Sequence, residues 1–289
     1  MTGEIRYNHR NRLMDLGARL QSATSDWQGP FFFIQMADCQ FGMANRPHGF
    51  RQEVAWFGKA MEHCNRLKPA FVAVCGDLID RPCDEAQTMA LFKTAALLDK
   101  SIPLHLVCGN HDINDIPNME TLSWYREGFG TDMYAVQDRG CRLIVLNTAT
   151  IYAPHNVALE VARQDEWLRE EMAAARRDRP YHTIVFQHHP WYRYEAMEPD
   201  STNNFPLQQR LMYLDLYVDS GVELVMAGHF HRNLYTHYRG MDMVASGPVG
   251  LSKYTDPTGL RIVKVYRNRI EHEYYGLDNV PERVTLEGE

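Results

Sequence analysis

The chain has 289 residues, of which 45% are hydrophobic and 23% charged, and its formal net charge at pH 7 is -7. This is the composition of an ordinary globular protein with a sizeable core, and a single α/β domain of this length is common. The acidic balance does not favour a nucleic-acid or anionic-membrane surface, so we expect neither partner.

The first 30 residues precede the first predicted strand. They begin MTGEIRYNHRNRLMDLGARL and lack the continuous apolar segment of a signal peptide. Residues 1–30 are predicted to form a helical extension that packs on the body, and residues 31–289 a single domain. No segment approaches the roughly 18 apolar residues of a membrane helix. The six cysteines form no C-x-x-C pair, which favours reduced residues over a disulfide framework, so we expect a cytoplasmic protein.

Apolar segments of strand length alternate with amphipathic segments along the next 200 residues. The apolar segments are nearly continuous, as in strands that are buried on both faces of a sheet. In residues 51–68, Val54, Phe57, Met61 and Cys64 follow one another at steps of three and four, which predicts a helix with these side chains inside. The alternation predicts a layered α/β fold. The predicted strands are 31–38, 70–77, 103–110, 141–148, 182–188 and 222–229, and the predicted helices are 51–68, 84–100 and 163–178.

The pattern changes toward the C-terminus. Residues 190–210 mix proline, asparagine and aromatic residues and are predicted to form a long functional loop. After residue 235, the segments MDMVASG, LRIVKVYRN and RIEHEYYGL are predicted strands without helices between them. We expect them to complete a second sheet.

Five of the predicted strands end in side chains that bind metals or transfer protons. In open α/β sheets, ligands bind beyond the carboxyl ends of the strands, so we expect these side chains to converge. Carboxylates, an amide oxygen and imidazoles suit hard-to-borderline divalent ions. The donors outnumber the ligands that one ion takes, which predicts two ions that share a carboxylate and act on a phosphoryl group. The residues are Asp38, Gln40, Asp77, Asp80, Asn110, His111, His188, His229 and His231.

Five short motifs carry a resemblance to a known family. The motifs ADCQ, GDLID, GNHD, QHHP and GHFH, all between residues 37 and 231, resemble the five-block signature of calcineurin-like metallophosphoesterases. The first two resemble the subgroup of calcineurin-like phosphoesterase domain-containing proteins, which are cytosolic protein phosphatases, and HHPWY is similar to the fourth block of purple acid phosphatases. The resemblance covers residues 31–231 and implies a four-layer α-β-β-α sandwich.

The resemblance also implies a ligand set for two metal ions. Asp77 would bridge both ions. Only one of the adjacent His188 and His189 is expected to point inward, because side chains alternate along a strand, and the family position favours His188; His189 would face substrate or solvent. The first ion would be held by Asp38 and His231 with Gln40 beside them, and the second by Asn110, His188 and His229.

Three further residues receive catalytic roles from the same resemblance. His111 would contact the phosphate or protonate the leaving alkoxide, and Asp80 would orient it. Arg81 matches an arginine that clamps phosphate, a task that suits a guanidinium. Two alternatives stay open: Asp80 is only the N-cap of a helix that the segment DRPCDE opens, and Arg81 is a solvated surface residue.

Gln40 departs from the family pattern, which usually has histidine at this position. An amide oxygen is a harder and weaker donor than imidazole. Among Mn, Fe, Zn and Mg, the candidate ions, we therefore expect a weaker first site that leans to Mn or Mg over Fe.

The implied function is that of a dinuclear, metal-dependent phosphoric ester hydrolase. A hydroxide between the ions would attack phosphorus without a covalent phosphoenzyme. The favoured substrate is a phosphomonoester, including the phosphoserine or phosphothreonine of a phosphoprotein. Two alternatives remain: a cyclic-nucleotide or other phosphodiesterase, since the same blocks serve both, and a metal-bound interaction scaffold with weak catalysis. A nucleic-acid phosphodiesterase is disfavoured, because the basic residues form no clustered run.

Overall fold

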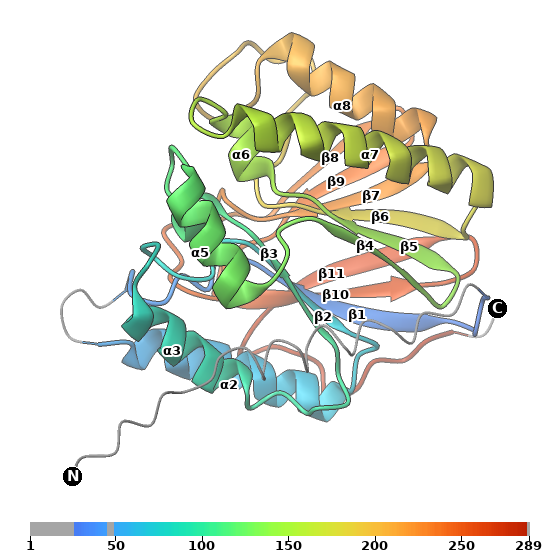
Figure 1. Cartoon of the computed structure of the whole chain (residues 1–289). Helices are drawn as coiled ribbons and strands as arrows, with labels where there is room; N and C mark the ends of the chain where they lie inside the picture. The colour runs from blue at the N-terminus through green and yellow to red at the C-terminus, as the bar shows by residue number, and fades with distance from the viewer. Residues whose placement is uncertain (1–25, 45–48, 288–289) are drawn as a thin grey trace.

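The computed structural model describes residues 26–44 and 49–287, which form two sheets packed face to face between two layers of helices (Figure 1). This confirms the predicted four-layer α-β-β-α sandwich. Of the predicted N-terminal extension, residues 1–25 lie outside the described residues. Trp27, just before the first strand, packs its ring 6.2 Å from that of Phe31 and 5.4 Å from that of Tyr181.

The first sheet has the strand order β11-β10-β1-β2-β3. Its three parallel strands are β1 (Phe31–Met36), β2 (Val72–Cys75) and β3 (Leu104–Val107). On the other side of β1, β10 (Gly259–Val265) pairs antiparallel with β1, and β11 (Ile270–Gly276) pairs antiparallel with β10.

The second sheet has the order β4-β5-β6-β7-β9-β8. Four of its strands are mutually parallel, and an antiparallel strand closes each edge. The parallel strands are β5 (Cys141–Val145), β6 (His182–Phe186), β7 (Val222–Ala227) and β9 (Met241–Ala245), and the edge strands are β4 (Tyr134–Asp138) and β8 (Leu234–Tyr238).

The six predicted strands are confirmed with shorter bounds, but the sheet assignment of the C-terminal segments is partly wrong. Only β9 joins the second sheet; β10 and β11 extend the first. The reason is packing: β10 pairs with β1 from Phe31↔Val265 to Gln35↔Arg261, and Val263 and Val265 thereby enter the core between the sheets. That core also holds Phe33 and Phe186, whose rings lie 5.7 Å apart.

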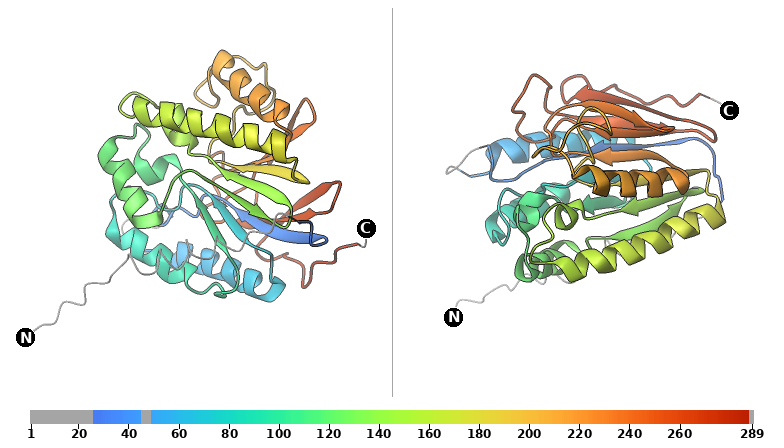
Figure 2. Two further views of the ribbon diagram at one scale, coloured as in Figure 1. Left: turned by 45° about the vertical axis from the view of Figure 1, so that its right-hand side comes forward. Right: turned by 90° about the horizontal axis from the view of Figure 1, so that it is seen from above.

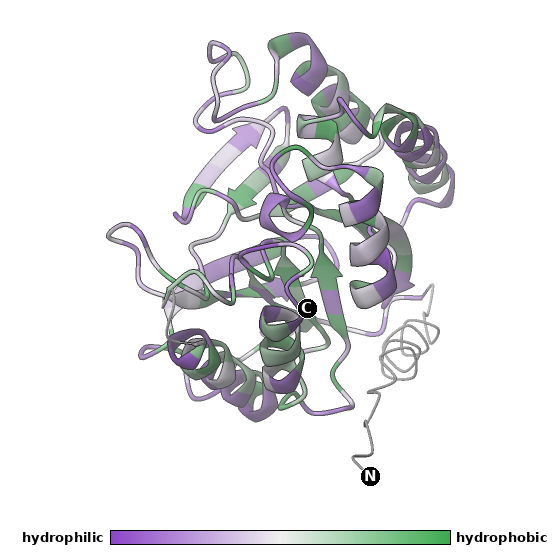
Figure 3. Ribbon diagram, turned by 60° about the vertical axis from the view of Figure 1, so that its left-hand side comes forward, coloured by the Kyte–Doolittle hydropathy of each residue, from purple (hydrophilic) through white to green (hydrophobic). Residues whose placement is uncertain are grey.

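Helices cover both outer faces (Figure 2). Residues of α2 (Arg51–Leu67), α3 (Glu85–Ala95) and α5 (Met119–Phe129) form one core cluster with the first sheet. Residues of α7 (Ala158–Asp178) and α8 (Leu207–Asp219) form another with the second sheet. The helices carry both hydrophilic and hydrophobic residues (Figure 3), as amphipathic covering helices do. Since α8 begins at Leu207, the loop predicted over 190–210 ends four residues early. Two short helices, α4 (Asn110–Ile113) and α6 (Thr148–Tyr152), follow β3 and β5.

The buried face of α2 differs from the prediction at one position. Phe57, Met61 and Cys64 are buried as expected, but Val54 is 41% exposed. Glu53 occupies the buried position instead, because its carboxylate accepts hydrogen bonds from the backbone amides of Gly42 and Ala44. Both amides bond to Oε1, while Oε2 is buried without a hydrogen-bond partner among the described residues. Among the described residues, no helix combines the length and apolar character needed to cross a bilayer.

Candidate metal centre

The carboxyl ends of strands from both sheets meet at one edge of the sandwich. The Asp38 amide, after β1, donates to Gly76 O after β2 at 3.0 Å, and the Gly228 amide, after β7, donates to His188 O after β6 at 3.0 Å. The two sheets are joined across this edge, since the His229 amide donates to the Asp38 carboxylate at 3.1 Å. The geometry therefore gathers seven predicted ligands: Asp38, Gln40, Asp77, Asn110, His188, His229 and His231.

An unusual backbone conformation aims several of these side chains. Five of the seven residues have a positive backbone φ angle, which residues other than glycine seldom adopt. Strain of this kind, about 1–3 kcal/mol per residue, persists where the surrounding structure enforces it, and it is concentrated at functional sites. The φ angles are 53° for Asp38, 37° for Gln40, 50° for Asp77, 71° for His229 and 52° for His231.

Two motif glycines permit the close approach of the strand ends. A Cβ on Gly109 would lie 2.1 Å from the Asp77 amide nitrogen. A Cβ on Gly76, whose φ is 80°, would lie 2.4 Å from His188 Nδ1. Both distances are far inside van der Waals contact, so the GN and GD motifs need glycine for steric reasons.

The first group of donors comprises Asp38, Asp77 and His231, whose ligand atoms lie within 4.8 Å of one another. His231 Nδ1 donates to Leu251 O at 3.0 Å, which leaves its Nε2 lone pair facing Asp38 Oδ1 at 3.6 Å. The amide nitrogen of Gln40 donates to Asp77 Oδ2 at 3.3 Å. The Gln40 oxygen is buried and, within the described part of the chain, accepts no hydrogen bond. A buried acceptor without a donor, next to two carboxylates, fits a cation.

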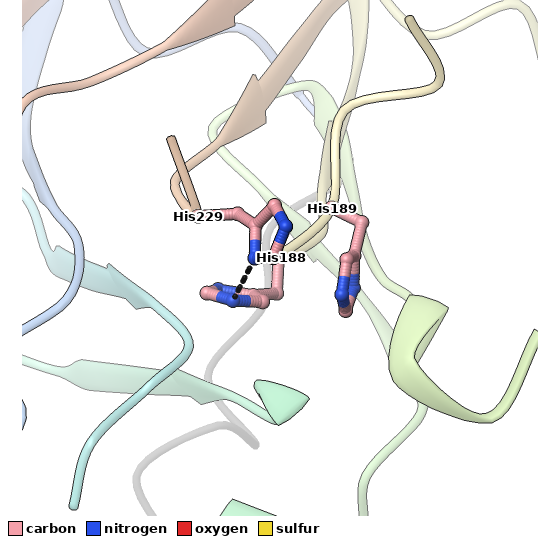
Figure 4. A group of neighbouring side chains, drawn as sticks. All are labelled: His188, His189 and His229. Atoms are coloured by element: carbon pink, nitrogen blue, oxygen red, sulfur yellow. Dashed lines mark hydrogen bonds between the residues drawn. The ribbon is translucent and has the colours of Figure 1, made fainter. Parts of the chain in front are cut away.

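The second group comprises Asn110, His188 and His229. His188 Nδ1 donates to Cys75 O at 2.9 Å, so Nε2 faces Asn110 Oδ1 at 3.0 Å and Asp77 Oδ1 at 3.3 Å. His229 Nδ1 lies 3.2 Å from the same amide oxygen and 3.3 Å from His188 Nε2 (Figure 4). Burial opposes the charge on His188, but Asp77 raises the pKa of His188 to about 9, so without a metal its Nε2 carries a proton toward Asn110 Oδ1. A cation that replaces this proton would have the same surrounding atoms as ligands. Asp77 adjoins both groups, as the bridging role requires.

The Asn110 amide is oriented by a residue outside the five motifs. Its Nδ2 donates to Asp115 Oδ1 at 2.7 Å, which turns Oδ1 toward the two imidazoles. Asn114, with φ 75°, directs the chain away from α4 just before Asp115. The sequence offered no signal for Asp115, because the contact depends on this local turn.

His189 is the second residue that sequence reasoning left without a role. Sequence analysis placed its side chain toward substrate or solvent. The solvent alternative is wrong, since the residue is only 3% exposed. Its ring stacks on Tyr152 at 5.1 Å and 6° and lies 4.3 Å from the His229 ring, and its ligand atom falls within 4.8 Å of those of His188 and His229 (Figure 4). The doubled histidine of QHHP was the available signal.

The charges of the site are strongly interdependent. Burial raises the pKa of Asp38 to about 8. Burial opposes ionisation of Asp77 as well, but His188 outweighs it and holds the pKa of Asp77 well below its usual range. Burial and the His188 charge lower the pKa of His229 to about 3. Two carboxylates and a neutral imidazole in one buried volume are the donor set that a cation stabilises.

The predicted catalytic residues border this centre. His111 donates its amide to Asp77 Oδ1 at 3.0 Å and its Nδ1 to Asp80 O at 2.9 Å, with Asp80 Oδ1 at 3.7 Å. Arg81 Nε lies 3.7 Å from Asp80 Oδ2, and the arginine side chain is 63% exposed. The alternative that Asp80 caps the following helix is wrong, because Asp84 is the N-cap of α3.

Asp112 holds two of the motifs together, a role that sequence reasoning did not assign. Its buried carboxylate accepts the amides of Leu78 at 2.9 Å, Ile79 at 3.1 Å and Gly109 at 2.8 Å. Burial raises the pKa of Asp112 to about 7. The fourth residue of GNHD therefore clamps the end of β3 to the end of β2.

Comparisons with known proteins agree with this geometry. The family model described as Calcineurin-like phosphoesterase matches residues 23–233. The chain is 36% identical over 292 residues to the serine/threonine-protein phosphatase CPPED1 of Homo sapiens, a match that covers 95% of this chain and 93% of the relative.

Solved structures share the fold at low sequence identity. A dimetal phosphatase from Danio rerio superposes with a TM-score of 0.62 at 17% identity, covering 86% of this chain and 96% of that one. Purple acid phosphatase from yellow lupin superposes with a TM-score of 0.67 at 14% identity, covering 89% of this chain and 53% of that one. With the family model and the curated relative, these matches establish that the chain belongs to the calcineurin-like phosphoesterase family and is a metal-dependent phosphoesterase.

Proposed function

We propose that the protein is a phosphomonoesterase that acts on phosphoserine and phosphothreonine residues of proteins. The observation that carries the proposal is the convergence of seven donors around Asp77. Asp38 and His231 form one group with it, Gln40 donates to it, and His188, which contacts Asn110 and His229, lies 3.3 Å from it. The similarity to CPPED1, named as a serine/threonine-protein phosphatase, supports the substrate class. Residues 31–289 would act as one domain, in the cytoplasm, where the six free cysteines stay reduced.

Two cations would occupy the two groups. Asp38, Gln40 and His231 would hold the first, Asn110, His188 and His229 the second, and Asp77 both. Bound there, two metal ions polarise a phosphoryl oxygen and lower the pKa of water. The amide at position 40 favours Mn or Mg over Fe at the first position.

His111 would supply the proton for the leaving alkoxide. Because its Nδ1 donates to the carbonyl of Asp80, Nε2 is the atom that takes up and delivers the proton. The carbonyl contact at 2.9 Å is shorter than the carboxylate contact at 3.7 Å, so Asp80 would orient the ring mainly through its backbone. The exposed guanidinium of Arg81 would clamp the phosphate.

The test compares monoester and diester hydrolysis by protein loaded with Mn. We expect para-nitrophenyl phosphate and a phosphoserine peptide to be hydrolysed at least ~10-fold more efficiently than bis-para-nitrophenyl phosphate, and His111→Ala to lose ~100-fold in kcat. A preference for the diester would replace this proposal with a phosphodiesterase. If the His111→Ala protein loses activity because it does not fold, the loss is no evidence for a catalytic role of His111.

A further inference from the structure

Two surface segments flank the GHFH turn that carries His229 and His231. One is the loop 190–206 and the other is the segment 251–258. Each presents a cation and an exposed tyrosine beside the metal centre. We call this set the recognition rim, and it consists of Arg193, Tyr194, Arg232, Lys253 and Tyr254.

On the first side, Arg193 is attached to the centre through Phe230. The Arg193 guanidinium carbon lies 5.8 Å from the Phe230 ring centroid and 4.9 Å from that of Tyr194. The Phe230 ring in turn lies 5.5 Å from the ring of His229. Two ring contacts therefore separate the cation from a predicted ligand.

The loop that carries Arg193 is held firmly. The fully buried Arg210 of α8 donates to the carbonyls of Ala196, Phe205 and Glu198. The Glu198 carboxylate accepts the backbone amides of Arg193 and Tyr194, both at 2.9 Å. A loop whose carbonyls and amides are bound in this way presents Arg193 in a fixed place, which lowers the entropy cost of using it.

On the second side, the rim is bonded directly to the centre. The Gly250 amide donates to Asp38 O at 3.1 Å, and Leu251 O accepts from His231 Nδ1 at 3.0 Å. Lys253 and Tyr254 follow within three residues. Arg232, next to His231, stacks its guanidinium 3.8 Å from the Tyr254 centroid.

Within the described residues, the three rim cations have no carboxylate partner. Over residues 26–44 and 49–287, no carboxylate oxygen lies within 4.0 Å of the charged nitrogens of Arg193, Arg232 or Lys253. Arg126 and Arg142 are paired, whereas exposed cations such as Arg176 and Lys100 are unpaired as well in this part of the chain. Tyr194 is 63% exposed and Tyr254 50%. Arginine and aromatic residues are enriched at protein interfaces, and free cations complement an anionic partner.

We propose that the recognition rim binds an extended phosphopeptide whose carboxylates lie on both sides of the phosphorylated residue. Arg193 would meet acidic residues on one side of the phosphate, and Arg232 and Lys253 those on the other, while the tyrosines pack against the peptide backbone. A small phosphoester offers no carboxylates for these cations. This inference rests on the proposed protein phosphatase function and specifies its substrates.

The experiment separates binding from turnover. A fluorescein-labelled peptide with a non-hydrolysable phosphonate in place of phosphoserine, flanked by glutamates, is titrated into Mn-loaded protein and followed by anisotropy, next to the same peptide flanked by glutamines. Kinetics with Mn-loaded protein then use the two corresponding phosphoserine peptides and para-nitrophenyl phosphate. The variants are Arg193→Gln, Arg232→Gln, Lys253→Gln and their combination, with the exposed Lys100→Gln as the matched charge control.

We expect the wild type to bind the acidic peptide more tightly than the glutamine peptide. Each single rim variant should bind the acidic peptide about threefold more weakly, as is usual for exposed charge pairs, and in the kinetics this loss should appear mainly in KM. The preference should fall with salt. Para-nitrophenyl phosphate hydrolysis and the Lys100→Gln variant should stay within about twofold of the wild type. If the wild type binds both peptides equally, or if the triple variant still prefers the acidic peptide, the proposal that the recognition rim binds acidic phosphopeptides is wrong. Failure to hydrolyse any monoester overturns the proposed function, while the anisotropy titration still decides the rim.

Discussion

Asp115→Ala is expected to weaken metal binding although Asp115 would not itself be a ligand. In the wild type, Asp115 accepts the Asn110 amide at 2.7 Å, and the oxygen of that amide lies 3.0 Å from His188 Nε2 and 3.2 Å from His229 Nδ1. Without the carboxylate, the amide loses the contact that keeps its NH2 group away from the imidazoles. The flipped amide would present donors where a cation requires an oxygen.

The size of the effect follows from the nature of the contact. A hydrogen bond to a charged acceptor contributes roughly 1.5–3 kcal/mol, and Asp115 is exposed, which places it at the lower end. Since 1.4 kcal/mol is a factor of ten, we expect about a tenfold loss of affinity at the second metal position, in the range usual for groups that orient ligands.

The assay is competition for Mn between the protein and a chelating dye, with thermal unfolding as the check on folding. Asp115→Asn keeps an acceptor oxygen and should recover most of the affinity, and Glu120→Ala, an exposed carboxylate on α5, should bind as the wild type does. If Asp115→Ala binds both ions with unchanged affinity, or if Asp115→Asn is as impaired as Asp115→Ala, the orientation argument is refuted.

Three other predictions concern the site and its support. Gln40→His should raise affinity at the first metal position about tenfold, since imidazole is the stronger donor; metal analysis that finds unchanged content and affinity would count against the weak-site prediction. Gly109→Ala places a Cβ 2.1 Å from the Asp77 amide and should destabilise the protein by at least ~2 kcal/mol in urea unfolding; a native-like midpoint would show that the strand ends separate easily. Burial lowers the pKa of His105 to about 4, from an ordinary value of 6.5. As the pH falls, the histidine of the unfolded chain is protonated at a higher pH than the buried one. The free energy of unfolding is therefore highest above pH 6.5 and decreases by about 3 kcal/mol as the pH falls toward 4. In metal-free protein, the His105→Gln variant should lose less stability between pH 6.5 and pH 4 than the wild type. If both proteins show the same dependence of stability on pH, His105 is not the cause.

Much of the architecture follows from local sequence. Most parallel strands are buried on both faces, although β3 alternates buried with intermediate residues, and their nearly continuous apolar segments identified them. The motifs at the strand ends could be recognised because each strand ends where its apolar run stops. Parallel alignment places the ends of β1 and β2 at one edge, so the approach of Asp38 to Asp77 was predictable without coordinates. His229 follows β7 of the other sheet, and its approach to Asp38 depends on how the two sheets pack.

Other features depend on contacts that no local pattern encodes. The edge strand β4 has intermediate burial throughout and β8 alternates intermediate with exposed residues, so their mixed sequences gave no clear strand signal. From its sequence, β10 could have joined either sheet. It pairs with β1 because Val263 and Val265 then pack into the core between the sheets. Asp112 and Asp115 act through backbone and side-chain atoms of neighbouring segments, and such roles appear only once those segments are placed.

The most direct test of the account is anomalous scattering from a crystal of the protein grown with Mn. A dinuclear centre would give two peaks, one between Asp38 and His231 and one between His188 and His229, with the Asp77 carboxylate in contact with both ions. A well-ordered crystal at saturating Mn with no peak at these positions, or with Asp77 turned away from them, would contradict it.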